Sequence, residues 1–145
     1  MNSRPELLSI IVPVYNEIRT VRAVIDRLLT IDLPVPREIL VVDDGSTDGT
    51  GNVLAMAMND YTQGIHDVGL GTRTAESLIP DPGSPIPDPR SRLMVISAER
   101  NAGKGAAIRL GLNAARGTIV AIQDADLELD PQQIAALVEI GRAHV

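Results

Sequence analysis

The sequence has no cysteine and few aromatic residues: it contains two tyrosines and neither phenylalanine nor tryptophan. Without cysteine, a disulfide framework, a cysteine nucleophile and a thiolate metal site are excluded. With so few aromatic rings, the stacking platforms that bind single-stranded nucleic acid are nearly excluded as well. A hydrophobic core must be built from isoleucine, valine, leucine and alanine.

The sequence also lacks an excess of basic residues, because 13 lysines and arginines face 19 acidic residues and give a formal net charge of −6. Proteins that bind nucleic acid usually carry a basic stripe that supplies most of their affinity. We therefore expect no nucleic-acid partner. An anionic ligand of this chain would need a metal ion or a local cluster of polar groups.

Long hydrophobic runs are missing too. The apolar stretch near the start, residues 7–14, is far shorter than the roughly 20 residues that cross a bilayer, and no basic leader precedes it. We expect neither a membrane span nor an export signal in these residues. The expected location is cytoplasmic, with the cytoplasmic face of a membrane as the alternative.

Short apolar runs rich in β-branched residues occur at residues 7–14, 39–42, 93–96 and 118–122. Continuous runs of this kind are typical of strands buried on both faces of a parallel sheet. Helical spacing of apolar residues is found in residues 20–29 and 101–116, and Asp130-Pro131 is a typical helix start. The sequence thus predicts an α/β protein with an open, mostly parallel sheet flanked by helices, with ligands at the carboxyl ends of the strands.

The 145 residues, 44% of them hydrophobic and 22% charged, fit a single domain with a sizeable core. We assign residues 1–138 to this domain. Within it, residues 59–92 lack periodicity and five prolines fall in residues 80–89, so we expect a proline-rich surface loop or a disordered insert. The last seven residues, 139–145, resemble the translation of a sequencing-library adapter and are interpreted as a non-native tail.

Carboxylates gather where predicted strands end. Asp44 follows one strand, and Asp124-Ala125-Asp126 follows another. In an extended backbone, the Asp-X-Asp spacing points both carboxylates to one face, where they can share a hard cation. The alternative is that Asp124 caps a turn and Asp126 is solvated. Asp44, at a strand tip, suits hydrogen bonds to a base or a ribose.

Two further segments carry candidate binding residues. Tyr15 and Glu17 follow the first strand and could hold a ring and its polar edge. Alternatively, Tyr15 covers the core and Glu17 starts the next helix. Lys104 lies between glycines at a predicted helix start, where backbone N–H groups and a cation can meet phosphate, although a solvated surface lysine is the alternative. Residues 46–48 are expected to cap the helix that follows them.

The order of these segments along one sheet is more specific than any of them alone. Together they resemble family 2 glycosyltransferases, and the nearest subgroup resembles the dolichyl- or polyprenyl-phosphate mannosyl- and glucosyltransferases. The segments that carry the resemblance are SIIVPVYNE (9–17), EILVVDDGSTDGT (38–50), RNAGKGAAIRLGLNAARG (100–117) and QDADLELDP (123–131).

The resemblance implies an incomplete GT-A fold that binds a nucleotide-diphospho-sugar. It implies metal-dependent, inverting transfer of a hexose from GDP-mannose or UDP-glucose to a polyprenyl or dolichyl phosphate, at a membrane surface. Asp124 and Asp126, of the DXD motif, would bind Mg²⁺ or Mn²⁺ against the donor diphosphate. The nucleotide-sugar site that it implies comprises Pro13, Tyr15, Glu17, Val42, Asp44, Lys104, Asp124, Ala125 and Asp126.

The family normally continues beyond the DXD strand into an acceptor half that these residues do not include. No catalytic base is therefore assigned, and the fragment alone is expected to be inactive. One alternative is a non-catalytic nucleotide-sugar-binding fragment or pseudoenzyme. A second alternative is a phosphatase of the haloacid dehalogenase type, which also uses Asp-X-Asp but places it on the first strand, whereas here the motif follows the fourth.

Overall fold

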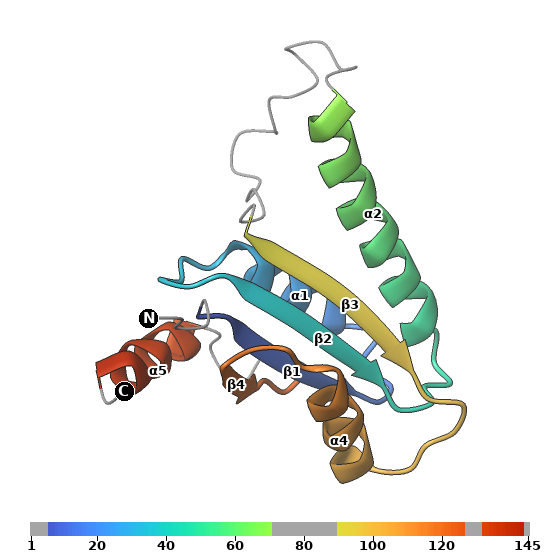
Figure 1. Cartoon of the computed structure of the whole chain (residues 1–145). Coiled ribbons are helices and arrows are strands. Elements are labelled where there is room, and N and C mark those ends of the chain that lie inside the picture. Colours follow the sequence, from blue (N-terminus) through green and yellow to red (C-terminus); the bar gives the residue numbers. More distant parts are fainter. Residues whose placement is uncertain (1–5, 71–89, 127–131, 144–145) are drawn as a thin grey trace.

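The computed structural model describes residues 6–70, 90–126 and 132–143 (Figure 1). Its centre is a parallel sheet with the strand order β3-β2-β1-β4. The expected parallel sheet is confirmed, and each strand lies within two residues of its predicted bounds. The strands are β1 (Leu8–Val14), β2 (Arg37–Asp43), β3 (Ser91–Ser97) and β4 (Ile119–Ile122).

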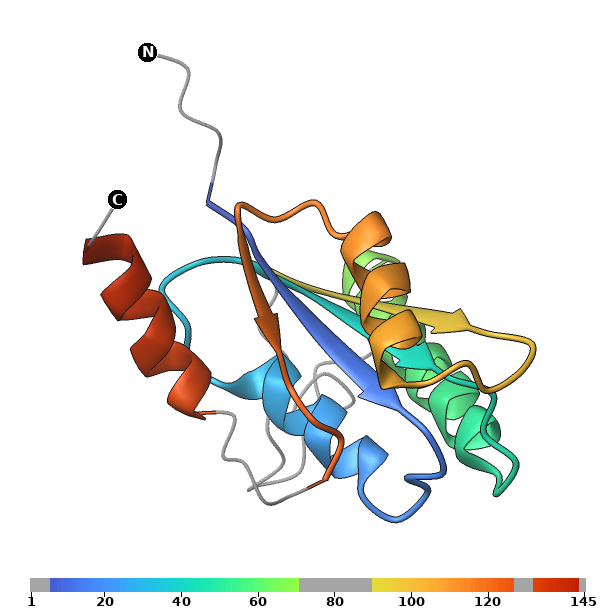
Figure 2. The same ribbon diagram turned by 90° about the horizontal axis from the view of Figure 1, so that it is seen from below.

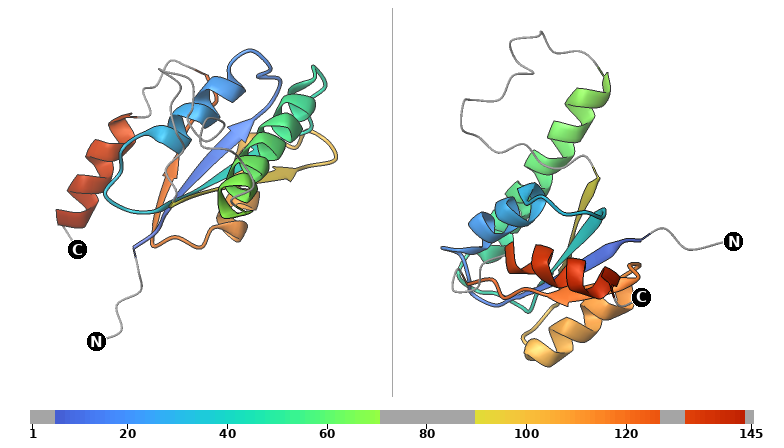
Figure 3. Two further views of the ribbon diagram at one scale, coloured as in Figure 1. Left: turned by 90° about the horizontal axis from the view of Figure 1, so that it is seen from above. Right: turned by 90° about the vertical axis from the view of Figure 1, so that its left-hand side faces the viewer.

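Helices alternate with the strands and cover both faces of the sheet. They are α1 (Val21–Thr30), α2 (Thr50–Leu70), α4 (Lys104–Ala114) and α5 (Gln132–Ala143). One core cluster joins buried residues of α1, α2 and α5 to one face, whereas α4 packs through Ala107 against Ile11, Leu40 and Val42 on the other. Figure 2 and the right-hand view of Figure 3 show α1 and α4 on opposite sides of the sheet.

This two-sided cover explains why the strand sequences are continuous rather than alternating. Every residue of β1 and of β2 is buried. Successive side chains point to opposite faces, so Ile10 and Ile39 enter the larger cluster while Ile11 and Leu40 enter the smaller one. A strand with apolar residues on both faces can be stable only at such a position.

The strand order creates a switch point. From β1 the chain proceeds outward through β2 to β3, and it then returns to place β4 on the opposite side of β1. In open parallel sheets, ligands bind in the crevice at the carboxyl ends of the strands where this reversal occurs. The reversal here lies between β1 and β4. Tyr15, which follows β1, and Asp124, which lies just after β4, are therefore expected beside the crevice.

Two charged residues at the start of β2 are fully or almost fully buried. Arg37 donates from Nη1 to the carbonyl oxygens of Leu28 (2.8 Å) and Ile31 (2.6 Å), which satisfies the C-terminal end of α1. Glu38 accepts at Oε2 from the Ser9 hydroxyl and from the Arg116 backbone N, both at 2.8 Å. These bonds tie the chain before β4 to the middle of the sheet.

The prediction of a loop or disordered insert over residues 59–92 is wrong for its first part and its last residues. Helix α2 continues to Leu70, and β3 begins at Ser91. Tyr61 packs against the larger core cluster and donates from its hydroxyl to the Ser91 carbonyl oxygen (2.6 Å). Tertiary packing thus supports helix where the local pattern is weak. The proline-rich residues 80–89 lie outside the described residues.

Helix α5 includes residues 139–143, so part of the expected non-native tail is helical. The interpretation of residues 139–145 as foreign sequence stays a prediction, because a helix can form whatever the origin of its last turn. In the part of the chain that the structure describes, no helix is both long enough and apolar enough to cross a membrane.

Candidate functional site

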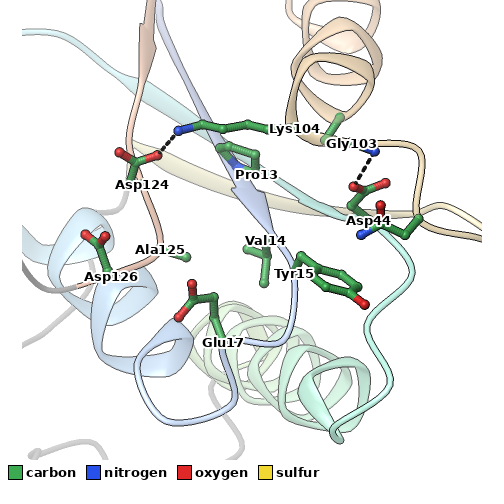
Figure 4. Close-up of a pocket in the computed structure, with 12 residues that line it drawn as sticks. Pro13, Val14, Tyr15, Glu17, Asp44, Gly103, Lys104, Asp124, Ala125 and Asp126 are labelled. Carbon is green, nitrogen blue, oxygen red and sulfur yellow. Dashed lines mark hydrogen bonds and ion pairs between the residues drawn. The ribbon is translucent and has the colours of Figure 1, made fainter.

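A pocket of about 380 Å³ lies at the carboxyl ends of the strands, beside the switch point (Figure 4). Its wall comes from four parts of the chain: the ends of β1, β2 and β4 and the N-terminus of α4. The lining residues are Pro13, Val14, Tyr15, Glu17, Asp44, Asn101, Gly103, Lys104, Ala107, Asp124, Ala125 and Asp126. The structure therefore brings together eight of the nine residues in the nucleotide-sugar site implied by the sequence, all except Val42.

The segment after β1 forms one wall of the pocket. Pro13 and Val14 are buried, whereas Tyr15 is 46% exposed, so its ring is available to a ligand. The alternative that Tyr15 covers the core is therefore wrong. Asn16 has a positive φ of 53°, a left-handed conformation that turns the chain sharply between Tyr15 and Glu17. In Figure 4 the Tyr15 ring and the Glu17 carboxylate lie on different sides of the end of β1.

Asp44 directly follows β2 and anchors the loop before α4. Its two carboxylate oxygens accept from the backbone N of Ala102 and of Gly103, both at 2.9 Å. Gly45 allows the two loops to approach, since a Cβ there would lie 2.6 Å from the backbone N of Asn101. Asp44 thus has a structural partner on each oxygen. Hydrogen bonds from Asp44 to a base or ribose stay a prediction.

Lys104, the first residue of α4, reaches across the pocket to the end of β4. Its Nζ lies 2.6 Å from Oδ1 of Asp124, and both side chains keep substantial solvent exposure. Lys104 follows Gly103, whose positive φ of 101° is a backbone conformation that disfavours residues with a Cβ. The Lys104 side chain is 60% exposed, as the alternative of a solvated surface lysine expects, and it also pairs with a carboxylate inside the pocket.

The Asp124–Asp126 segment has the alternation expected of an extended Asp-X-Asp stretch. Ala125 is 3% exposed and belongs to the larger core cluster, while Asp124 and Asp126 are partly exposed and line the pocket. Figure 4 shows both aspartates on the same side of the pocket. Burial of the small residue therefore orients the two carboxylates toward the same space.

Two carboxylates fit a divalent cation that a ligand helps to bind. Within residues 6–70, 90–126 and 132–143, no group of three histidine, cysteine or acidic side chains is placed to hold a metal ion. Mg²⁺ is commonly bound by one or two carboxylates together with substrate phosphates and water. Asp124 and Asp126 match this coordination by two carboxylates, with the remaining ligands to come from a phosphate group and water.

Val42 is the predicted site residue that the structure places elsewhere. It is fully buried in the smaller core cluster, beneath α4, and does not line the pocket. The sequence interpretation missed Val14, Asn101, Gly103 and Ala107, which do line it. Asn101 lies in the same glycine-rich segment as Lys104, so its closeness in sequence to Lys104 could have predicted that it lines the pocket. Val14 and Ala107 carried none, since both read as ordinary core residues.

The chain belongs to glycosyl transferase family 2. The family profile matches residues 9–74 and 86–143, which is most of the chain. The predicted family is thereby confirmed, and the alternative of a haloacid-dehalogenase-type phosphatase is wrong. The gap in the match, residues 75–85, lies within residues 59–92 and overlaps the proline-rich residues 80–89.

A curated relative with a known role is the undecaprenyl-phosphate 4-deoxy-4-formamido-L-arabinose transferase of Yersinia pestis (strain Pestoides F). It is 31% identical over 143 residues, which is 97% of this chain and 35% of the relative. The chain therefore spans about a third of the length of the relatives that it matches.

Solved structures share the fold. A mannosyltransferase from Pyrobaculum calidifontis in complex with GDP-Man and Mn²⁺ has a TM-score of 0.62 and 27% identity, covering 94% of this chain and 32% of that one. TarS from S. aureus in complex with UDP-GlcNAc has a TM-score of 0.62 and 21% identity, covering 94% and 31%. The expected GT-A fold is confirmed.

Proposed function

We propose that this chain is the donor-binding part of a metal-dependent glycosyltransferase that transfers a hexose from a nucleotide-diphospho-sugar to a polyprenyl phosphate. One observation carries the proposal: Asp124, Asp126 and Lys104 face one pocket at the switch point of the sheet. Carboxylates that hold a cation and a lysine at a helix start are complementary to a diphosphate.

Each wall of the pocket has a part in this proposal. Asp124 and Asp126 hold Mg²⁺ or Mn²⁺, which would neutralise charge that develops on the departing nucleoside diphosphate. Lys104 exchanges its bond to Asp124 for a bond to a donor phosphate. Tyr15 and Glu17 bind the nucleoside from the other wall, and Asp44 keeps the Lys104 loop in place through Ala102 and Gly103.

The transfer itself requires little acid–base help from the chain. An acceptor phosphate oxygen is already anionic, so it can attack the sugar carbon without a strong general base. The bond from that carbon to the acceptor oxygen forms as the bond to the diphosphate oxygen breaks, and the electron pair leaves with the nucleoside diphosphate. A single in-line attack of this kind inverts the configuration at the sugar carbon.

The polyprenyl acceptor is supported by the curated relatives, whose printed names include undecaprenyl phosphate. The donor sugar has weaker support. The Yersinia pestis relative is named for a deoxy-formamido-pentose, and the similar solved structures contain GDP-Man or UDP-GlcNAc. A test must therefore offer several donors rather than one.

The first experiment is a binding titration of the 145-residue chain by calorimetry, with GDP-mannose, UDP-glucose and a nucleotide-linked 4-deoxy-4-formamido-L-arabinose. Each donor is titrated with MnCl₂ and again with EDTA. We expect one donor to bind only with the metal, and Asp126→Ala to weaken that binding about tenfold or more, because so few protein ligands hold such a cation. Asp32→Ala, which removes an exposed carboxylate between α1 and β2, is the matched control.

The second experiment tests transfer by the full-length protein, with radiolabelled donor and undecaprenyl phosphate in detergent. Formation of a labelled lipid that Asp126→Ala abolishes would support the proposal. Metal-dependent binding without transfer would instead support the non-catalytic nucleotide-sugar-binding alternative. Equal donor binding with MnCl₂ and with EDTA would contradict the metal-dependent proposal.

A further inference from the structure

Hydrogen bonds between side chains and backbone groups connect the loop after β1 to the loop after β2. The backbone N of Asn16 donates to Oγ of Ser46 at 2.9 Å, and the backbone N of Thr47 donates to Oδ1 of Asn16 at 2.8 Å. This reciprocal pair holds Asn16 in its left-handed conformation. A non-glycine residue in that conformation persists only where its surroundings hold it there.

Thr50 connects Glu17 to the loop after β2 in the same way. Thr50 is fully buried, and its Oγ1 accepts from the backbone N of Glu17 at 3.1 Å. The same hydroxyl donates to Oδ1 of Asp48, whose other oxygen accepts from the backbone N of Ile18 at 3.4 Å. The hydrogen bond from Thr50 lowers the pKa of the Asp48 carboxyl, which is therefore charged at neutral pH and accepts hydrogen bonds.

Thr20 makes the corresponding connection on the opposite side of Glu17. Its hydroxyl donates to the backbone carbonyl oxygen of Ala125 at 2.6 Å and lies 3.2 Å from Oε2 of Glu17. Ala125 stands between the two aspartates of the pocket. Thr20 thus couples the segment after β1 to the segment that presents Asp124 and Asp126, although the two are separated by more than 100 residues in the chain.

Neither threonine is among the described residues that line the pocket. Both contact the segment after β1. Thr50 accepts from the Glu17 backbone N, and Thr20 lies beside the Glu17 carboxylate and donates its hydroxyl hydrogen to the Ala125 carbonyl oxygen. A hydroxyl that served only to start a helix would bond within its own helix. These two instead join three loops that are distant in sequence.

We propose that Thr50 and Thr20 are positioning residues that set the geometry of the donor pocket, by fixing the Tyr15–Glu17 segment between the β2–α2 loop and the Asp124–Asp126 segment. This inference rests on the proposed function for the identity of the ligand. The physical reason is that binding groups must be held close to their working geometry to contribute fully, and a small displacement is costly.

The test compares two pairs of variants in the 145-residue chain. Thr50→Val and Thr20→Val keep the shape of the side chain and remove the hydroxyl, whereas Thr50→Ser and Thr20→Ser keep the hydroxyl and remove a methyl group. The first readout is amide hydrogen exchange of residues 15–18, which needs no ligand. The second is the affinity for GDP and for UDP with Mn²⁺, measured beside the thermal unfolding midpoint.

We expect Thr50→Val to speed amide exchange at Glu17 and to weaken nucleotide binding about tenfold, the fold-change that corresponds to one lost buried hydrogen bond. Thr50→Ser is expected to stay within about threefold of wild type, since the hydroxyl is retained. We expect Thr20→Val to weaken nucleotide binding in the same way, and Thr20→Ser to restore it. A purely structural role would lower the unfolding midpoint of the valine and serine variants alike without separating their nucleotide affinities.

Two outcomes would overturn the positioning role: equal nucleotide affinity in each valine variant and its serine partner, or wild-type exchange at residues 15–18 in Thr50→Val. Failure of the proposed function gives a different result. In that case wild type binds neither nucleotide, while the exchange data still decide whether the Thr50 hydroxyl holds the Glu17 segment.

Discussion

Lys104 and Asp124 form an ion pair across the candidate donor pocket, with Nζ and Oδ1 2.6 Å apart. The lysine starts α4 and the aspartate follows β4, so the pair connects two walls of the pocket. Its position has a chemical consequence, because Asp124 is also one of the two carboxylates suited to a divalent cation. If Asp124 holds a cation as proposed, Lys104 and that cation would compete for the Asp124 carboxylate.

Replacing Lys104 with methionine should therefore raise the affinity of the ligand-free chain for Mn²⁺. The expected gain is about two- to fivefold, because exposed ion pairs are worth at most about 1 kcal/mol. Titration of free Mn²⁺ by electron paramagnetic resonance measures the effect. The same variant should bind GDP with Mn²⁺ more weakly than wild type, since it lacks the lysine ammonium group that would face the diphosphate.

Arg92→Met is the matched control for Lys104→Met. It makes the same change in charge at an exposed residue near the start of β3, at the far end of the sheet from the pocket. If both variants raise Mn²⁺ affinity equally, net charge rather than the Asp124 pair explains the result. An unchanged Mn²⁺ affinity in Lys104→Met would contradict the competition.

Asp44→Ala should destabilise the fold by about 2–3 kcal/mol, because it leaves the backbone N–H groups of Ala102 and Gly103 without their charged acceptor. Urea denaturation measures the change in the free energy of unfolding. Asp44→Asn keeps one oxygen acceptor and should fall between wild type and alanine. Asp32→Ala, at an exposed position, should stay within about 0.5 kcal/mol of wild type. Equal stability of Asp44→Ala and wild type would show that the loop does not depend on this anchor.

Asp48 predicts a specific acid sensitivity. The hydrogen bond from Thr50 lowers its pKa below the ordinary value of 3.8, so the folded state favours the charged form. Its contribution to stability is complete above pH 3.8 and is lost as the pH falls through the lowered pKa of the folded state. Thermal unfolding midpoints from pH 6 to pH 2 should therefore fall more steeply for wild type than for Asp48→Asn. Parallel curves would exclude a stabilising role for the Asp48 carboxylate.

Glu38→Leu should cost about 2–4 kcal/mol, since the buried Ser9 hydroxyl and the Arg116 backbone N lose the acceptor that they share. Glu38→Gln keeps an oxygen at the same place and should cost less than half as much. Denaturant unfolding gives the free energies, and amide exchange in β4 reports whether the strand loosens. If glutamine and leucine are equally destabilising, the negative charge rather than the acceptor is what the fold requires.

Part of the fold could be predicted from local patterns because the relevant forces are local or repeat along the chain. The strands at Leu8–Val14 and Arg37–Asp43 are continuous apolar runs, and burial on both faces of a sheet is the way to remove such runs from water. Helix α1 was visible from its apolar spacing. Helix α2 beyond residue 59 was not, because contacts such as Tyr61 with Ser91 support it.

The candidate site divides in the same way. The carboxylates of Asp124 and Asp126 could be assigned to one face from their spacing, and burial of Ala125 provides the reason. Val42 could not be excluded, because a strand sequence does not say which residues are covered by a helix from elsewhere in the chain. The partners of Asp44 and Thr50 could not be predicted either. Asp44 bonds to the loop before α4, and Thr50 bonds to the loop after β1, and both loops are distant in sequence from these residues.

By itself, the sequence determined the element order, the parallel sheet and the chemical types that gather at strand ends, because these follow from composition and periodicity. The family was indicated by the resemblance of its ordered motifs to family 2 glycosyltransferases. Only the tertiary structure decided that β4 lies beside β1, that Lys104 meets Asp124 and that two threonine hydroxyls join three loops. Those relationships depend on where non-adjacent segments pack, and the free energy of packing is a property of the whole core rather than of any one segment.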